Sequence, residues 1–356
     1  LGLATPMAMM VGIGKSAEKG ILIRDAASLE IAKKIDTVVL DKTGTLTQGK
    51  PAVTDVVVLN SQITKGQILQ MAASIESKSE HPLGKAIILA AASLGQKSSH
   101  LLDKAIKEEA IQEKLDLFEV SDFEAMPGKG IKGNLLFGAK KIPVAVGSRE
   151  LIKFLNLEAA SVEDKMIILE NEGKTVMVLI LDNEITGLIA VADVLKSETK
   201  EAIKALKKSK LEIWMITGDN ERTAKAIAKQ VGIENIMAQV LPENKTAKIQ
   251  ELQKQGKKVA MAGDGINDAP ALAQSDLGVA MGEGTDIAME SANVTLMRGD
   301  LRLVPQIIKL SGRTMRIVKQ NLFWAFAYNT VLIPVAAGVL YPFFGILLNP
   351  ILAAAA

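Results

Sequence analysis

Residues 37–45 read TVVLDKTGT, a short run of β-branched and apolar residues that ends in an Asp-Lys-Thr-Gly-Thr loop. Two later stretches have the same form: 212–219 (EIWMITGD) and 259–268 (VAMAGDGIND). Helical patterns that follow or separate these runs lie at 197–208, 220–231 and 243–255. Strands that alternate with helices predict an α/β fold with a doubly wound parallel sheet.

The segment between the first two of these strands is much longer than an ordinary connection. A crossover between parallel strands needs about a dozen residues or more, usually one helix, whereas 53–191 lies between the first loop and the next strand of the sheet. We therefore expect an inserted α+β domain over 53–191. Its own strands are expected near 56–59, 174–181 and 185–191, and its helices near 65–75 and 83–94.

The composition excludes several classes of protein. The 42 basic and 40 acidic residues nearly balance, which argues against a dedicated nucleic-acid binder. The sequence has no cysteine, which excludes a disulfide scaffold and any thiolate nucleophile or thiolate metal site within these residues. The 48% of apolar residues is ample for a sizeable core, so the chain is not intrinsically disordered.

Apolar residues concentrate at the two ends of the sequence. Residues 1–14 carry no charge, but as a helix they would rise only about 21 Å, against about 30 Å for a bilayer core. We expect a partial transmembrane helix there, with a buried core helix as the alternative. Residues 321–340 are uncharged over the length of one span and predict a transmembrane helix, followed by a partial one over 343–356.

Basic residues flank these apolar segments. Lys15 and Lys19 follow the first, and Lys309 and Arg313 precede the second. Positive flanks mark the cytoplasmic side of a membrane, so we expect residues 15–320 to be cytosolic in an integral membrane protein. Ordinary solvated helix faces remain the alternative for these charges.

The loops after the three strands carry the residues suited to chemistry. Asp41 directly follows a buried strand, where a carboxylate can act as a covalent nucleophile toward a phosphoryl group. Thr217 opens a loop that leads into a helix, so backbone amides there face an anion. Asp264 and Asp268 offer the hard oxygen ligands that Mg²⁺ prefers, and Lys245 can balance phosphoryl charge. A single Asp-Gly loop is usually only a turn, but three at strand ends indicate a site.

These motifs resemble those of the P-type ATPases, whose pattern is DKTGT (41–45 here), TGD (217–219) and GDGxND (263–268). Other segments are similar to the copper-exporting, heavy-metal branch of that family. They are SEHPL at 79–83, MPGKGIKG at 126–133, LGLATP at 1–6 and the Tyr328-Asn329 pair.

The resemblance implies a domain organisation. It predicts a haloacid-dehalogenase-like phosphorylation domain in two parts, 35–52 and 192–302, split by a nucleotide-binding domain over 53–191. Cytosolic linker helices are expected at 15–34 and 303–320, next to the membrane segments.

The resemblance also implies a role for individual residues. Asp41 would attack the γ-phosphate of ATP, while Thr217, Lys245 and Asp268 complete the phosphoryl pocket. Mg²⁺ would be held by Asp41, the Thr43 carbonyl and Asp264.

ATP contacts in the inserted domain are expected from Glu76, His81, Gly128 and Gly130. Candidates for binding the transported metal are Tyr328 and Asn329.

The implied function is ATP-driven heavy-metal export through an aspartyl phosphate on Asp41, with Cu(I) as the expected metal and Mg²⁺ and ATP as cofactors. The implied partners are ATP, the metal, a lipid bilayer and a metallochaperone, with no nucleic acid, in a bacterial inner membrane. Alternatives are a pump for Cu(II) or another metal, a soluble haloacid-dehalogenase-type phosphatase, and a non-catalytic relic. Thr43 stands where such phosphatases usually carry a second Asp.

Several features depart from the family pattern. Asn244 precedes Lys245 where Asp is usual, Ser148 follows Gly147 where Asn is usual, and Val194 replaces a common proline after Asp193. The sequence also contains neither Cys-Pro-Cys nor the Thr-Gly-Glu of an actuator domain. We therefore expect the C-terminal catalytic portion of a pump, which does not transport by itself.

Overall fold

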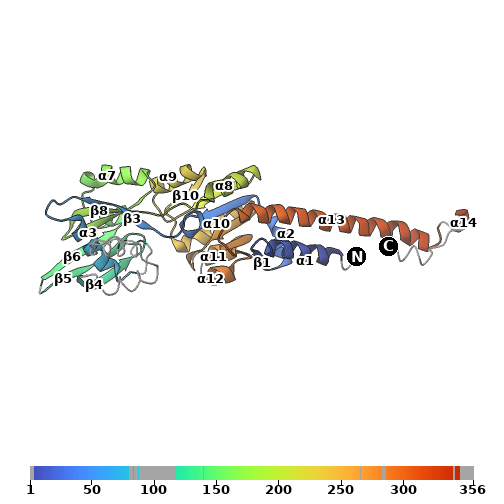
Figure 1. Ribbon diagram of the computed structural model, residues 1–356, viewed down its shortest axis with the longest axis horizontal. Helices are drawn as coiled ribbons and strands as arrows, with labels where there is room; N and C mark the ends of the chain where they lie inside the picture. Colours follow the sequence, from blue (N-terminus) through green and yellow to red (C-terminus); the bar gives the residue numbers. More distant parts are fainter. Residues whose placement is uncertain are drawn as a thin grey trace. The chain divides into compact units, whose positions relative to one another are not determined.

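The computed structural model describes residues 4–79, 83, 87, 117–138, 140–264, 266–282, 286–339 and 341–344 (Figure 1). The chain forms two compact units. One comprises Leu1–Val38, Lys204–Glu212 and Thr246–Ala356, and the other Val39–Ile203 and Ile213–Lys245. Of the helix predicted at 83–94, only Leu83 and Ile87 lie among the described residues.

Seven strands form one sheet in the order β1-β13-β12-β11-β2-β9-β10. Their bounds are β1 Ile21–Ile23, β2 Thr37–Asp41, β9 Glu212–Ile216, β10 Asn235–Met237, β11 Val259–Gly263, β12 Leu277–Met281 and β13 Val294–Leu296. β11 pairs with β12, β12 with β13, and β9 with β10 in parallel, whereas the edge strand β1 is antiparallel to β13. The three predicted strands and the predicted α/β class are confirmed.

β2 has the properties of a central strand. All five of its residues are buried, as both faces of a strand must be when helices cover each side of a parallel sheet. Helices in the same part of the chain are α8 (Thr199–Lys208), α9 (Glu221–Val231), α10 (Lys245–Lys254), α11 (Ala269–Gln274) and α12 (Asp286–Ser291).

Local sequence sets the ends of two of these helices. Asn220 caps α9, because its side chain accepts a hydrogen bond from the Thr223 amide, and Gly232 ends it with a φ of +81°. Pro242 opens a 3₁₀ turn over Pro242–Asn244, so α10 begins at Lys245, two residues later than the predicted 243.

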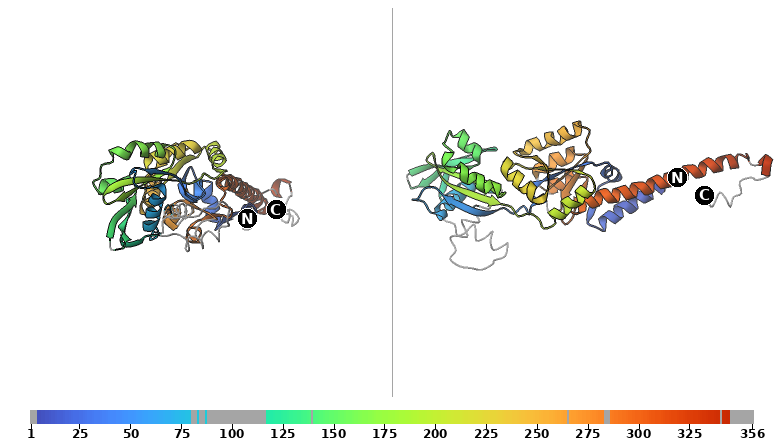
Figure 2. Two further views of the ribbon diagram at one scale, coloured as in Figure 1. Left: turned by 60° about the vertical axis from the view of Figure 1, so that its left-hand side comes forward. Right: turned by 90° about the horizontal axis from the view of Figure 1, so that it is seen from above.

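A second, antiparallel sheet has six strands in the order β3-β8-β7-β6-β5-β4. The bounds are β3 Ala52–Val58, β4 Glu119–Met126, β5 Gly130–Phe137, β6 Lys140–Gly147, β7 Thr175–Leu181 and β8 Glu184–Ala192. One core lies between this sheet and α3 (Lys65–Glu76), and another between its opposite face and the helices α6 (Arg149–Phe154) and α7 (Ala160–Asn171) (Figure 2).

The predicted linker helix over 15–34 is wrong. The structure has α1 (Ala4–Ala17), then strand β1, then α2 (Ala26–Ala32). Gly20 takes a left-handed φ of +77°, which ends the helix and starts the chain into the edge strand. The Asp25 carboxylate then caps α2 by accepting from the Ser28 amide at 2.7 Å.

The linker helix predicted at 303–320 and most of the span predicted at 321–340 form one continuous helix, α13, from Leu303 to Ala336. It stops short of the predicted residue 340: Pro334 lies in its last turn, and Gly338 has a φ of +83°. A short helix, α14 (Tyr341–Phe344), follows.

α1 lies beside the first part of α13 (Figures 1 and 2). A Cβ atom on Gly12 would come within 2.7 Å of Thr314 Oγ1, so glycine permits this close approach. Across the described part of the chain, no helix combines the length and the apolar composition needed to cross a bilayer. The spans predicted at 1–14 and 321–340 are therefore not confirmed, and the one predicted at 343–356 lies outside the described residues except for its first two.

Candidate active site

Asp41 is the last residue of β2 and is only 5% exposed. The chain then turns tightly over Lys42–Leu46, where Gly44 has a φ of +73°, a conformation that favours glycine. The Thr47 hydroxyl lies inside this turn: it accepts a hydrogen bond from the Gly44 amide at 3.3 Å and lies 3.0 Å from the Lys42 carbonyl. The turn therefore fixes the backbone that follows the predicted nucleophile.

Lys245, at the start of α10, is paired with Asp41. Its Nζ lies 2.8 Å from Asp41 Oδ1, and the two side chains are 10% and 7% exposed. A buried carboxylate needs such a partner, because desolvation of an unpaired charge costs several kcal/mol, on the order of 3–5 when a partner is lost. The structure thus brings together two residues that lie 204 positions apart in the sequence.

A second buried ion pair joins the same turn to the loop after β9. Lys42 Nζ lies 2.7 Å from Asp219 Oδ2, and both side chains are 10% exposed. The Thr217 hydroxyl donates to Asp219 Oδ2 at 3.1 Å and accepts from the Asp219 amide at 3.1 Å. Neither Lys42 nor Asp219 was predicted as a site residue, although each lies inside one of the motifs quoted above, DKTGT and TGD.

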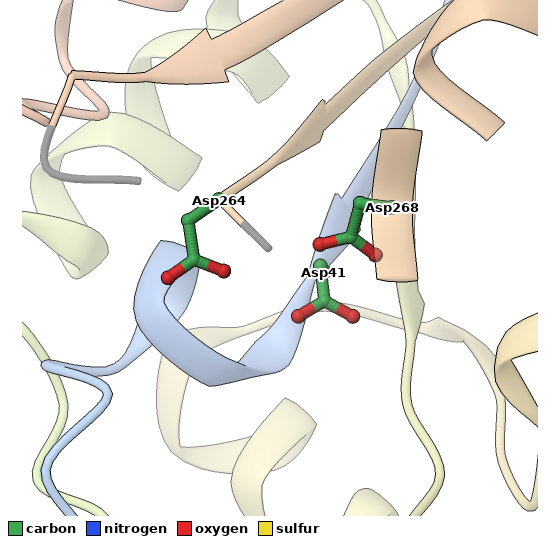
Figure 3. A group of neighbouring side chains, drawn as sticks. All are labelled: Asp41, Asp264 and Asp268. Atoms are coloured by element: carbon green, nitrogen blue, oxygen red, sulfur yellow. The ribbon is translucent and has the colours of Figure 1, made fainter. Parts of the chain in front are cut away.

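Asp41, Asp264 and Asp268 form an acidic group, in which one carboxylate oxygen of each lies within 4.8 Å of the others (Figure 3). Asp264 directly follows β11, and Asp268 precedes α11. A Cβ atom on Gly263 would lie 2.7 Å from Asp268 Oδ2, so glycine leaves the space that this carboxylate occupies. Three carboxylates so close together repel one another unless a cation lies between them, and hard oxygen ligands suit Mg²⁺. The residues present therefore fit the predicted metal.

The predicted metal ligand Thr43 lies in the turn after Asp41, with an extended backbone at φ −74° and ψ 128°. Thr45, in the same turn, is fully buried, and its hydroxyl has no hydrogen-bond partner among the described residues. Thr45 was not predicted as a site residue, although it belongs to the DKTGT motif.

Of the predicted nucleotide-binding residues, Glu76 lies in helix α3, Gly128 in the turn between β4 and β5, and Gly130 at the start of β5. Glu76 ends α3 and is 3% exposed; its Oε2 has no hydrogen-bond partner in the part of the chain that the structure describes. Burial raises the pKa of the Glu76 carboxyl to about 7, against which a hydrogen bond from Ser79 acts weakly. His81 lies outside the described residues.

Gly128 and Gly130 flank the turn between β4 and β5. Gly128 has a φ of +74°, and a Cβ atom on Gly130 would lie 2.2 Å from the Val146 carbonyl oxygen. The Ser148 hydroxyl lies 3.4 Å from the Gly128 carbonyl and 3.3 Å from that of Lys129. Ser148, which departs from the family pattern, therefore contacts this loop.

The predicted candidates for the transported metal, Tyr328 and Asn329, lie on α13. The Asn329 side-chain amide donates to the Ala325 carbonyl of its own helix at 2.7 Å, and Tyr328 is 38% exposed.

Comparisons with known proteins bear on this site. Residues 35–276 match the family described as haloacid dehalogenase-like hydrolase. The whole chain is 47% identical to a "Copper-transporting P-type ATPase" of Rhizobium leguminosarum bv. viciae, and 96% of it is 48% identical to a "Copper-exporting P-type ATPase" of Staphylococcus saprophyticus. Among solved structures, the "catalytic CPx-ATPase domain CopB-B" is 30% identical, with a TM-score of 0.58 over 83% of this chain and 98% of that one. The chain belongs to the P-type ATPases of the haloacid dehalogenase-like family.

A second structural relative of this P-type ATPase chain is a zinc-transporting PIB-type ATPase in an E2.Pi state. It is 32% identical, with a TM-score of 0.62, and the match covers 94% of this chain and 51% of that one. The chain spans about 40% of the length of the two curated relatives named above.

Proposed function

We propose that this chain is the catalytic portion of an ATP-driven heavy-metal exporter, in which Asp41 receives the γ-phosphoryl group of ATP. One observation carries the proposal: Asp41, at the end of a buried strand, is paired at 2.8 Å with the buried Lys245 and belongs to the acidic group with Asp264 and Asp268. A nucleophilic carboxylate, a fixed cation and hard oxygen ligands are the parts that phosphoryl transfer to aspartate requires.

In the proposed reaction an Asp41 carboxylate oxygen attacks the γ-phosphorus of ATP. The bond from that phosphorus to the β–γ bridging oxygen breaks, and ADP leaves with the electron pair. Lys245 balances the negative charge on the incoming phosphoryl oxygens, and the Thr217 hydroxyl donates a hydrogen bond to one of them. Asp41, the Thr43 carbonyl and Asp264 would hold Mg²⁺, which supplies charge neutralisation when bound, and Asp268 completes the acidic pocket.

The proposed adenine site uses Glu76, His81, Gly128 and Gly130. The buried Glu76 Oε2, which has no hydrogen-bond partner among the described residues, supports this assignment, because the exocyclic amine of adenine can donate to it. Gly128, in the β4–β5 turn, has a positive φ and no side chain, so a flat ligand can approach its backbone closely. A side chain on Gly130 would instead meet the Val146 carbonyl, so this glycine permits the pairing of β5 with β6. ATP would thus bind the inserted domain, 53–191, and present its phosphates to Asp41.

We further propose Cu(I) as the exported ion, because the curated relatives named above are copper transporters. The zinc-transporting structural relative makes Zn²⁺ the ion to compare in an assay. In the whole protein, Tyr328 and Asn329 would contribute to the transport pathway, within the lipid bilayer of a bacterial inner membrane, and a metallochaperone would deliver the ion.

Labelling with γ-³²P-ATP and Mg²⁺ tests the enzymatic part of the proposal. The wild-type chain is expected to acquire acid-stable, hydroxylamine-labile label, and Asp41→Asn to acquire none, because the amide has the same shape but no anionic oxygen. Label that persists in Asp41→Asn would contradict the assignment. Rapid hydrolysis of p-nitrophenyl phosphate without any trapped label would instead favour a phosphatase.

A further inference from the structure

Two segments of the chain lie against each other along a row of hydrogen bonds, a contact we call the seam. One segment, 170–175, runs from the end of α7 into β7; the other, 219–223, runs from the loop after β9 into α9. The Thr223 hydroxyl donates to the Lys174 carbonyl at 2.8 Å, and the Thr175 hydroxyl donates to Asp219 Oδ1 at 3.0 Å. The seam therefore joins the six-stranded sheet directly to the loop that carries Thr217.

Asp219 is the member of the seam that reaches the active site. Its Oδ2 accepts from the Lys42 ammonium at 2.7 Å and from the Thr217 hydroxyl at 3.1 Å, while its Oδ1 accepts from Thr175. Donors on both oxygens prevent the 10%-exposed carboxylate from rotating. Thr175 is the donor on Oδ1, and it belongs to the six-stranded sheet.

We propose that Thr175 is a positioning residue for phosphoryl transfer, which acts through Asp219 on Lys42 and Thr217. This inference rests on the proposed phosphorylation of Asp41. In the structure the Thr217 hydroxyl donates to Asp219, so it must rotate to reach a phosphoryl oxygen. The bond from Thr175 keeps Asp219 in place during that rotation, and Asp219 keeps Lys42 and its backbone turn next to Asp41.

A charge cluster around the buried Glu170 connects the two segments of the seam beside Thr175. Glu170 is 2% exposed, and Arg149 Nη2 lies 2.9 Å from each of its carboxylate oxygens. Arg222 Nη1, from the first turn of α9, adds a contact at 3.2 Å, and the Asn220 amide adds another at 3.2 Å. Both groups belong to the segment that follows Asp219, so this cluster fixes the distance between Thr175 and Asp219.

From the position of the seam we expect that a change at Thr175 affects the rate of phosphoryl transfer but not the affinity for the nucleotide. Thr175 contacts a residue of the phosphoryl site, whereas the proposed adenine residues lie at the end of α3 and in the β4–β5 turn. Removing the Thr175 hydroxyl should therefore slow the transfer and leave the ATP affinity unchanged. Loss of a hydrogen bond to a charged group changes an equilibrium constant or a rate constant by a factor of about 10 or more.

The experiment compares Thr175→Val, which keeps the side-chain shape without the hydroxyl, with Thr175→Ser, which restores it. Thr54→Val is the matched control, because Thr54 is a part-buried threonine of the same sheet whose hydroxyl donates to the Ala190 carbonyl at 3.3 Å. The rate of label incorporation on Asp41 at saturating ATP is measured by rapid quench, and the dissociation constant of ATP by calorimetry. Thermal melting of each variant confirms that it is folded, and Thr175→Ala replaces Thr175→Val if the latter does not fold.

We expect Thr175→Val to label about tenfold more slowly at an unchanged ATP dissociation constant, with Thr175→Ser and Thr54→Val within about twofold of the wild type. A wild-type rate in Thr175→Val, or an equal loss in Thr175→Ser, would overturn the inference while leaving the labelling of Asp41 intact. If the wild-type chain acquires no label, the proposed function fails and this inference fails with it.

Discussion

The Thr47 hydroxyl lies 2.6 Å from Asp193 Oδ2, and it joins the two chain segments that connect the sheets. The same carboxylate accepts hydrogen bonds from the amides of Gly49 and Lys50, each at 3.1 Å. Because Thr47 also fixes the Lys42–Leu46 turn after Asp41, this contact links that turn to both chain segments that connect the sheets. Asp193, which follows β8 in one connection, thus holds the other connection through its contacts with Thr47, Gly49 and Lys50.

Replacing Asp193 by Ala is therefore expected to destabilise the chain. The variant loses three hydrogen bonds to a part-buried carboxylate, which should lower the free energy of unfolding by about 2–3 kcal/mol. Urea denaturation of the two proteins measures this difference. Asp193→Asn keeps one acceptor oxygen, so its urea midpoint should lie between those of Asp193→Ala and the wild type. Equal midpoints for Asp193→Ala and the wild type would contradict the role assigned to this contact.

The buried carboxyl of Glu76 makes stability depend on pH. Its pKa is about 7 in the folded chain against 4.5 when exposed, so between these values the folded state binds more protons than the unfolded state. The resulting stabilisation is complete below pH 4.5 and is lost as the pH rises to about 7, a change of up to about 3 kcal/mol.

Glu76→Gln tests this dependence, because the amide has nearly the same shape and does not titrate. Urea midpoints measured at pH 5 and pH 8 should fall less for Glu76→Gln than for the wild type. The same change of the urea midpoint between pH 5 and pH 8 in both proteins would show that the Glu76 carboxyl is not protonated in the folded state.

Glu170 and Glu163 provide a matched pair for the charge cluster around Arg149. The Glu170 side chain is 2% exposed and the Glu163 side chain 33% exposed, although both form ion pairs with Arg149. Glu170→Ala leaves the half-buried Arg149 guanidinium without the buried carboxylate that it contacts through both oxygens, and should cost about 3 kcal/mol. Glu163→Ala should cost less than about 1 kcal/mol, because water can replace the exposed partner. Equal destabilisation by the two substitutions would contradict the importance assigned to burial.

Gly263→Ala is expected to weaken Mg²⁺ binding. The added methyl group would meet Asp268 Oδ2 at 2.7 Å and Cβ at 2.8 Å, so Asp268 must shift from its place beside Asp41 and Asp264. We expect the dissociation constant for Mg²⁺, measured by calorimetry, to rise about tenfold, a cost of the size seen when groups around the metal ligands are changed. Gly312→Ala is the control, since nothing lies within 4 Å of the added group; similar affinities in both variants would contradict the magnesium assignment.

The sequence predicts the strands that carry the site because their apolar runs are continuous. β2, β9 and β11 are largely buried, and an Asp follows or ends each of these runs. β4 was not predicted because five of its eight residues are exposed, so it lacks an apolar run or a regular alternation. β1 was not predicted for a different reason. A strand of three residues is too short to show an alternating pattern, and its partner β13 lies about 270 residues away in the sequence.

The candidate site was predictable at the level of its motifs but not of its pairings. Asp41, Lys245 and Asp264 could be named because each lies in or beside a recognisable loop. The contact between Thr175 and Asp219 could not, since Thr175 begins an ordinary strand and only the fold brings it to the loop after β9.

Mapping the phosphorylated residue by mass spectrometry tests whether Asp41 receives the phosphoryl group. The wild-type chain is incubated with ATP and Mg²⁺, quenched in acid and reduced with borohydride, which converts an aspartyl phosphate into homoserine. Tandem mass spectrometry then locates the reduced residue. We expect homoserine at position 41 alone; homoserine at position 219, 264 or 268, or at no position, would contradict the assignment of Asp41 as the phosphoryl acceptor.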